Sequence, residues 1–196
     1  MEFAKLSFEW GTTLQDFIEF WSAFYKYPKE HLYSERIERQ EFTVDDLEKL
    51  FEWKNGIPLS QKKKASLKRI TDKIHLVNQM KSTFDIETFM TEFDSISAIW
   101  KIYLLHLIVP KTYPIFDQHV CRAFYFLTEH KLREIPNKGT EKENLYLGYY
   151  VDFFNSLADG KSRKKIDEAL WALGKFLKTD YGNRIVSPSP NNSTNG

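Results

Sequence analysis

Residues 95–109 read SISAIWKIYLLHLIV, and this stretch decides the fold class. Large apolar side chains occupy almost every turn of a helix drawn through it, and the run is interrupted by Lys101 and His106. A helix that is apolar on all faces is buried. Because the run is shorter than the roughly 18 apolar residues that mark a membrane span, the stretch predicts the central helix of a globular core.

Apolar residues recur at helical spacing on both sides of this stretch. A basic helix is expected from Ser60 to about Met80, another helix from Leu145 to Leu157 after the polar connection IPNKGTEKEN, and a last one over KKIDEALWALGKFLK. Further helices are expected to begin at capping residues, namely Thr13, Thr43, Asp85 and Asp117. No alternating strand pattern competes with these helices, so the sequence predicts an all-α fold.

The composition is that of a folded globular chain. With 196 residues, 42% apolar and 16% aromatic, it can bury a substantial core. We expect residues 1–186 to form one helical unit, or a unit of two lobes, with the segment 85–130 at its centre. The polar, proline-bearing tail at 187–196 is expected to be disordered.

Charge and cysteine content restrict the classes of function. The net charge is +1, so any nucleic-acid face must be local. Two basic stretches are candidates, with solvated helix faces as the alternative: Lys62, Lys63, Lys64, Lys68 and Arg69, and then Lys161, Arg163, Lys164 and Lys165.

The single cysteine, Cys121, points to a reducing compartment, and we expect a cytoplasmic protein with no leader and no membrane span. Without a thiol cluster, we also expect no metal and no cofactor.

The segment 93–127 places a helix, a proline-bearing loop and an aspartate at the start of the next helix. The residues Pro-Ile-Phe-Asp-Gln-His-Val at 114–120, followed by Arg122 and Leu127, resemble the catalytic core of the helix-hairpin-helix DNA glycosylases. The resemblance implies a compact all-α fold with an active-site cleft between helical lobes. Ser95 and Ser97 stand where that family has hairpin glycines, which predicts a reshaped turn, since serine lacks glycine's freedom at positive φ.

By this resemblance Asp117 is the catalytic carboxylate. It would stabilise the positive charge that develops on the sugar and position or deprotonate the nucleophile; the alternative is a helix cap alone. Some members of the family carry a nucleophilic lysine about 18 residues earlier that forms a Schiff base. That spacing lands on Ile99, whereas Lys101 lies 16 residues before Asp117. Lys101 is therefore either the nucleophile or a lysine that snorkels or pairs with an acid, in which case water attacks.

The same resemblance suggests the remaining site residues. Contacts with DNA are expected from Ser95, Ser97, Lys111, His119, Arg122 and Lys164. A pocket for an extruded base is expected from Trp100, Phe116, Asp167 and Trp171. The alternatives are a structural ion pair for Arg122, core packing for most aromatic residues, and a satisfied core position for His106.

The sequence thus predicts a monomeric DNA glycosylase that excises a damaged or modified base extruded from duplex DNA, with or without cleavage of the abasic strand. Base excision repair and defence against phage DNA with modified bases both fit this chemistry. The alternative is a catalytically silent helical module that retains the fold and binds DNA or a partner protein.

Overall fold

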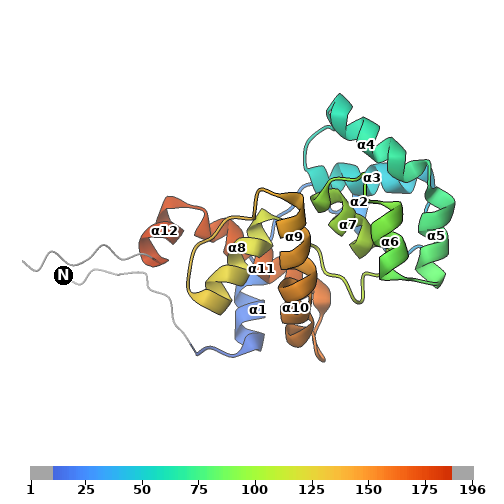
Figure 1. Ribbon diagram of the computed structural model, residues 1–196. Helices are drawn as coiled ribbons and strands as arrows, with labels where there is room; N and C mark the ends of the chain where they lie inside the picture. Colours follow the sequence, from blue (N-terminus) through green and yellow to red (C-terminus); the bar gives the residue numbers. More distant parts are fainter. Residues whose placement is uncertain (1–10, 187–196) are drawn as a thin grey trace, which may run out of the picture. The chain divides into compact units, whose positions relative to one another are not determined.

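The computed structural model describes residues 11–186, and every regular element in that range is a helix (Figure 1). The predicted all-α fold is therefore confirmed for this part of the chain; the predicted tail at 187–196 lies outside the described residues. The chain divides into two compact units. Within the described range, the first contains residues 11–25, 117–135 and 156–186, and the second contains residues 26–116 and 136–155.

The first unit is built around one long helix. The long helix, α11, packs against both α8 and α1; in Figure 1 α8 and α11 lie side by side. Its apolar stripe, from Ile166 through Leu170 and Leu173 to Leu177, is buried along its whole length, as predicted. The helices of this unit are α1 (Leu14–Ser22), α8 (Gln118–Glu129), α11 (Arg163–Leu177) and α12 (Asp180–Val186).

The second unit surrounds α7 (Ala98–Ile108). Ile99 is half-buried and every other residue of α7 is buried, which confirms the predicted central helix. The other helices assigned to this unit are α2 (His31–Ser34), α3 (Val44–Asn55), α4 (Gln61–Thr71), α5 (Ile74–Ser82), α6 (Ile86–Glu92), α9 (Gly139–Leu145) and the π-helical turn at Tyr146–Tyr150. The remaining helix, α10 (Val151–Leu157), contains residues of both units.

Local capping signals set several helix ends, including the predicted starts at Thr43 and Asp85. Thr43 and Asp46 form a reciprocal capping box at the start of α3, and Gly56 ends that helix in the left-handed conformation, with φ of 72°. Asp85 caps α6 through a hydrogen bond that its Oδ2 accepts from the Thr88 amide at 2.7 Å. These ends depend on neighbours within four residues, which is why the sequence alone places them.

The single basic helix predicted from Ser60 to about Met80 is wrong. The chain leaves the helical conformation at Lys73, with φ of −106° and ψ of 25°, and this separates α4 from α5. The Lys73 ammonium donates to the Glu92 carbonyl at 2.6 Å and to its carboxylate at 2.9 Å. This contact joins residues 19 positions apart, so the periodic pattern of the helix gave no sign of the break.

The helix predicted to begin at Leu145 begins earlier, at Gly139, inside the stretch expected to be a polar connection. Its first turn lies close to α7: a Cβ placed on Gly139 would be 3.6 Å from that of Ala98. Contact with α7 explains why a polar, weakly periodic stretch is helical here, because tertiary packing supplies most of a helix's stability.

None of the helices between residues 11 and 186 has both the length and the apolar character needed to cross a bilayer.

Candidate functional site

Asp117 is the N-cap of α8, and the amides of that helix hold its carboxylate. Its Oδ1 accepts hydrogen bonds from the backbone N–H groups of His119 at 2.7 Å and Val120 at 3.1 Å. The side chain is half-buried. A carboxylate at this position also benefits from the partial positive charge of the helix N-terminus. The predicted cap is thus confirmed, and the carboxylate is held in one orientation.

His119 lies in the first turn of α8 and faces α11. Its ring meets Trp171 edge-on, with the ring centroids 5.2 Å apart. Burial lowers the pKa of the imidazole, although the Asp117 carboxylate opposes this effect. The backbones also approach closely: a Cβ on Gly174 would lie 1.8 Å from the His119 carbonyl oxygen. Burial where α8 and α11 meet therefore favours the neutral form of His119.

Arg122 is one turn further along α8 and is 2% exposed. Its Nη2 donates to both carboxylate oxygens of Glu134 at 2.7 Å, and its Nε donates to Glu134 Oε1 at 3.1 Å. Its Nη1 donates to the Gly174 carbonyl at 2.8 Å. Arg122 thus forms a structural ion pair, which was the alternative to a contact with DNA. Its guanidinium also joins α8 to α11 through the Gly174 carbonyl.

Trp171 and Asp167, the base-pocket candidates on α11, are both buried. The Trp171 ring also contacts Tyr25, with ring centroids 5.3 Å apart, and the Lys175 ammonium lies 4.7 Å from it. Lys164, on the same helix, lies 5.0 Å from the ring of Tyr25. The first unit therefore brings His119 and Trp171 into contact and keeps the Trp171 face covered.

The turn between α6 and α7 contains Ser95 and Ser97, both exposed. Among residues 11–186, no serine has a positive φ, so the turn does not need the glycines of the family it resembles. The guanidinium of Arg69, on α4, donates to the Ser95 carbonyl at 3.1 Å. This contact places a basic residue of the α4 face beside the turn. Lys111, after α7, is also exposed.

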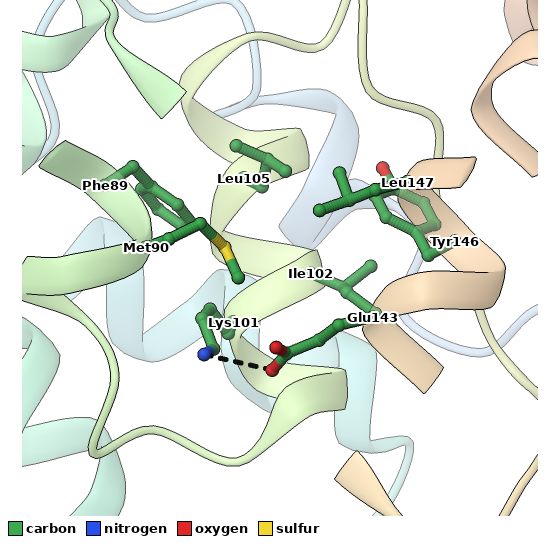
Figure 2. Close-up of a pocket in the computed structure, with 8 residues that line it drawn as sticks. All are labelled: Phe89, Met90, Lys101, Ile102, Leu105, Glu143, Tyr146 and Leu147. Carbon is green, nitrogen blue, oxygen red and sulfur yellow. Dashed lines mark ion pairs between the residues drawn. The ribbon is translucent and has the colours of Figure 1, made fainter. Parts of the chain in front are cut away.

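Lys101 lies in the first turn of α7 and is buried. Its Nζ forms an ion pair with Oε1 of Glu143, on α9, at 2.9 Å, and lies 3.9 Å from Oδ1 of Asp94. Figure 2 shows Lys101 and Glu143 pointing toward each other beside a pocket that Met90 and Tyr146 help to line. The pocket has a volume of about 10 Å³, close to the minimum for one water molecule. It does not hold a nucleobase in this conformation.

The other aromatic candidates lie in the core of the second unit. Phe116 is fully buried, and its ring centroid lies 4.8 Å from that of Tyr150. Trp100 packs on Phe51 at 4.8 Å. Both Phe116 and Trp100 therefore pack in the core, which was the alternative to a base pocket. Neither ring presents a face for stacking on an extruded base in this conformation.

His106 is a satisfied core residue. Its Nδ1 lies 2.8 Å from the Tyr113 carbonyl oxygen, and its Nε2 lies 2.8 Å from the Tyr33 hydroxyl. Because a carbonyl can only accept, Nδ1 carries a proton, and in the neutral imidazole Nε2 then accepts from the Tyr33 hydroxyl. Both ring nitrogens therefore serve the core.

Glu134, Glu143 and Gly174 are the residues that sequence reasoning missed. Glu143 stands in a stretch expected to be a loop, 42 positions after the lysine that it pairs with. The available signal was the buried lysine itself, because an ammonium in an apolar helix calls for a carboxylate partner. Nothing local indicated which carboxylate that would be.

Comparison with known proteins finds no relative: no protein-family model, no curated protein and no solved structure matches the chain. Candidate functional residues gather in two neighbourhoods, one in each unit. The first joins Asp117, His119 and Trp171 at the contact of α8 with α11, and the second joins Lys101 and Glu143 at the start of α7. Among residues 11–186, no three His, Cys, Asp or Glu side chains are grouped as metal ligands.

Proposed function

We propose that this protein is a DNA glycosylase of the helix-hairpin-helix type, in which Asp117 is the catalytic carboxylate and water is the nucleophile. The observation that carries the proposal is the Asp117 carboxylate, half-buried and oriented by two amides at the start of α8. It follows α6, a tight turn, α7 and a proline-bearing loop, an order that resembles the catalytic segment of those enzymes.

An oriented carboxylate fits the chemistry of base excision. As the bond between the sugar C1′ and the base nitrogen breaks, its electron pair leaves with the base and positive charge grows on the sugar. A carboxylate held in advance stabilises that charge, because little reorganisation is needed during the reaction. The same group can orient the water whose oxygen bonds to C1′.

Exposed basic side chains support duplex DNA as the partner. The lysines of α4 and Arg69 are exposed, and Arg69 contacts the backbone of the turn between α6 and α7. Positively charged side chains beside exposed backbone amides suit phosphate binding. We therefore propose that α4 and the turn at Ser95 and Ser97 contact the DNA backbone, and that the protein acts as a monomer on a damaged or modified base.

One observation favours the second candidate, a silent helical module that binds DNA or a partner protein. Arg122 and Lys101, two of the residues expected to act on DNA, are both buried in ion pairs. A module of this kind would keep these pairs for stability and would need no carboxylate chemistry at Asp117.

Base release from a panel of duplexes separates the two candidates. The duplexes would carry single oxidised, alkylated, deaminated or hypermodified bases, and alkali would then cleave any abasic site. Asp117→Asn is expected to reduce excision at least tenfold, about 1.4 kcal/mol of transition-state stabilisation. Asp85→Asn is the matched control, because Asp85 is also an N-cap aspartate and should leave excision unchanged. Equal losses in both variants, or DNA binding without excision of any base, would favour the silent module.

A further inference from the structure

We infer that the lysines along one face of α11 form a second DNA-binding surface, which holds phosphates of the duplex on the unit that contains Asp117. The surface consists of Lys164, Lys175 and Lys178, and we call it the α11 lysine stripe. The inference rests on the proposed function and specifies how the first unit would hold DNA, since the basic helix α4 belongs to the second unit.

The spacing of these lysines places them on the same side of the helix. Trp171, Lys175 and Lys178 follow Lys164 by 7, 11 and 14 positions, and these offsets are close to whole turns of 3.6 residues. Lys178 is the C-cap and keeps helical backbone angles, with φ of −78° and ψ of −16°. Fourteen residues of helix rise about 21 Å. The stripe is therefore long enough to contact the phosphates of several nucleotides.

Two aromatic rings hold two of these ammonium groups in place. Nζ of Lys175 lies 4.7 Å from the ring centroid of Trp171, and Nζ of Lys164 lies 5.0 Å from that of Tyr25. The two rings contact each other, with centroids 5.3 Å apart. An ammonium ion over such a ring is attracted by it. Because the rings are packed in the fold, these cations lose less freedom when they bind an anion.

The end of the stripe formed by Lys175 and Lys178 carries charge that no carboxylate neutralises. At the start of α11, Glu168 pairs with Lys165 at 2.8 Å and lies 3.9 Å from Lys164. Lys175 and Lys178 are both exposed and make no ion pair within residues 11–186. Both acids of α11 are buried. The surface at this end of the helix is therefore positive and complementary to phosphate.

The stripe lies close to the residues that hold the Asp117 carboxylate. The Trp171 ring meets the His119 ring, with centroids 5.2 Å apart, and the charge of Lys178 adds to the effect of burial in lowering the pKa of His119. The His119 amide in turn donates to Asp117 at 2.7 Å. Because each sugar of a DNA strand is bonded to phosphates, a strand that brings its sugar to Asp117 also brings phosphates to this part of the unit.

The covered state of Trp171 favours phosphates over bases as the ligand. The residue is 8% exposed, so no base stacks on its ring in this conformation. Contacts with phosphates position DNA and carry no sequence information. They also make binding sensitive to salt, because each phosphate of B-DNA that is neutralised contributes about 0.9 to the slope of log affinity against log salt concentration.

The test measures the affinity for an undamaged duplex by fluorescence anisotropy between about 50 and 200 mM salt. The double variant Lys175→Gln with Lys178→Gln is expected to bind about tenfold more weakly and to reduce the salt slope by about 1.8, since two phosphate contacts are lost. Lys175→Arg with Lys178→Arg keeps both charges and should keep the native slope. In the duplex panel, the glutamine variant should raise KM and leave kcat near the native value, because phosphate contacts bind substrate and transition state alike.

The matched control removes two lysines whose charge is already neutralised. Lys138 pairs with Glu141 at 3.2 Å, and Lys165 pairs with Glu168 at 2.8 Å. The double variant Lys138→Gln with Lys165→Gln lowers the net charge by the same amount as the test variant. It should leave both the affinity and the salt slope close to those of the native protein.

Failure of this inference and failure of the proposed function give different results. An unchanged slope in the glutamine variant, or an equal loss in the control, would overturn the α11 lysine stripe whatever the panel shows. A lower unfolding midpoint with native affinity would assign Lys175 and Lys178 to stabilising the end of α11 and would also overturn it. So would binding to phosphatidylserine vesicles but to no duplex. The expected change in slope without release of any base would instead support the stripe and count against the glycosylase.

Discussion

Each unit contains a buried cation paired with a glutamate. The two cations differ in how many acceptors their nitrogen atoms contact. Arg122 directs three nitrogens at Glu134 and the Gly174 carbonyl, with donor-acceptor distances of 2.7 to 3.1 Å. Lys101 makes one close contact, with Glu143, and one distant contact, with Asp94. The planar guanidinium binds several acceptors in a fixed geometry, whereas the ammonium acts as a single point charge.

This difference separates a cation that joins helices through several hydrogen bonds from one that joins them through a single ion pair. Guanidinium stays charged at any pH relevant to proteins, so Arg122 can fasten helices but cannot become a nucleophile. The Lys101 ammonium has one close acceptor, so it joins α7 to α9 through a single ion pair with Glu143. The stability of the first unit should therefore depend strongly on the bonds that Arg122 makes to Glu134 and Gly174.

The largest expected effect is that of Gly174→Ala. The added methyl group would overlap the His119 carbonyl oxygen, which would force α8 and α11 apart and disturb the bond from Arg122 to the Gly174 carbonyl. We expect a loss of about 3 kcal/mol in the free energy of unfolding, measured by urea titration. Gly148→Ala is the control, because nothing lies within 4 Å of its added Cβ. Similar unfolding midpoints for the two variants would show that the helices do not need this close approach.

Arg122→Lys is expected to have the next largest effect, a loss of about 2 kcal/mol. Lysine keeps the charge but cannot reach both Glu134 and the Gly174 carbonyl in the same geometry. Arg133→Lys is the control in the same unit, because Arg133 pairs with Glu129 at the surface at 2.8 Å, and such pairs contribute about 0.5 kcal/mol or less. Equal losses would mean that Arg122 contributes charge alone.

A smaller effect is expected from the pH dependence of His119. Burial lowers the pKa of this histidine in the folded protein, so below about pH 6.5 the unfolded state binds the proton more readily. Stability is therefore lost as the pH falls. His119→Gln should lose less stability than the native protein between pH 7 and pH 5, as measured by unfolding midpoints across that range. Parallel curves for the two proteins would contradict the buried, neutral state of His119.

The reactivity of the buried Cys121 thiol reports on the packing of α8 without any substitution. Burial, reinforced by the charge of Glu134, raises the pKa of this thiol to about 12. Because the thiolate is the reactive form, the native protein should react with a disulfide reagent about a hundredfold or more slowly than the urea-unfolded chain at pH 8. The chain has one cysteine, so the signal is unambiguous, and fast reaction in the native state would show that α8 opens readily.

The sequence by itself determined the all-α class, the central α7 and the caps at Thr43, Asp85 and Asp117. Each of these depends on apolar periodicity or on hydrogen bonds that a side chain makes within a few residues of itself. The position of Asp117 at the start of α8 was predictable for the same reason, whereas the catalytic role assigned to it comes from a resemblance.

Only the tertiary structure decided how the buried cations are partnered, where α4 ends and where α9 begins. Lys101 and Glu143 are 42 positions apart, and Arg122 reaches Gly174 across 52. At such separations the partner is chosen by which helices pack together, and no local spacing records that choice. The carboxylate that pairs with Lys101 therefore cannot be determined from the lysine or its helix, because packing brings that carboxylate from another helix.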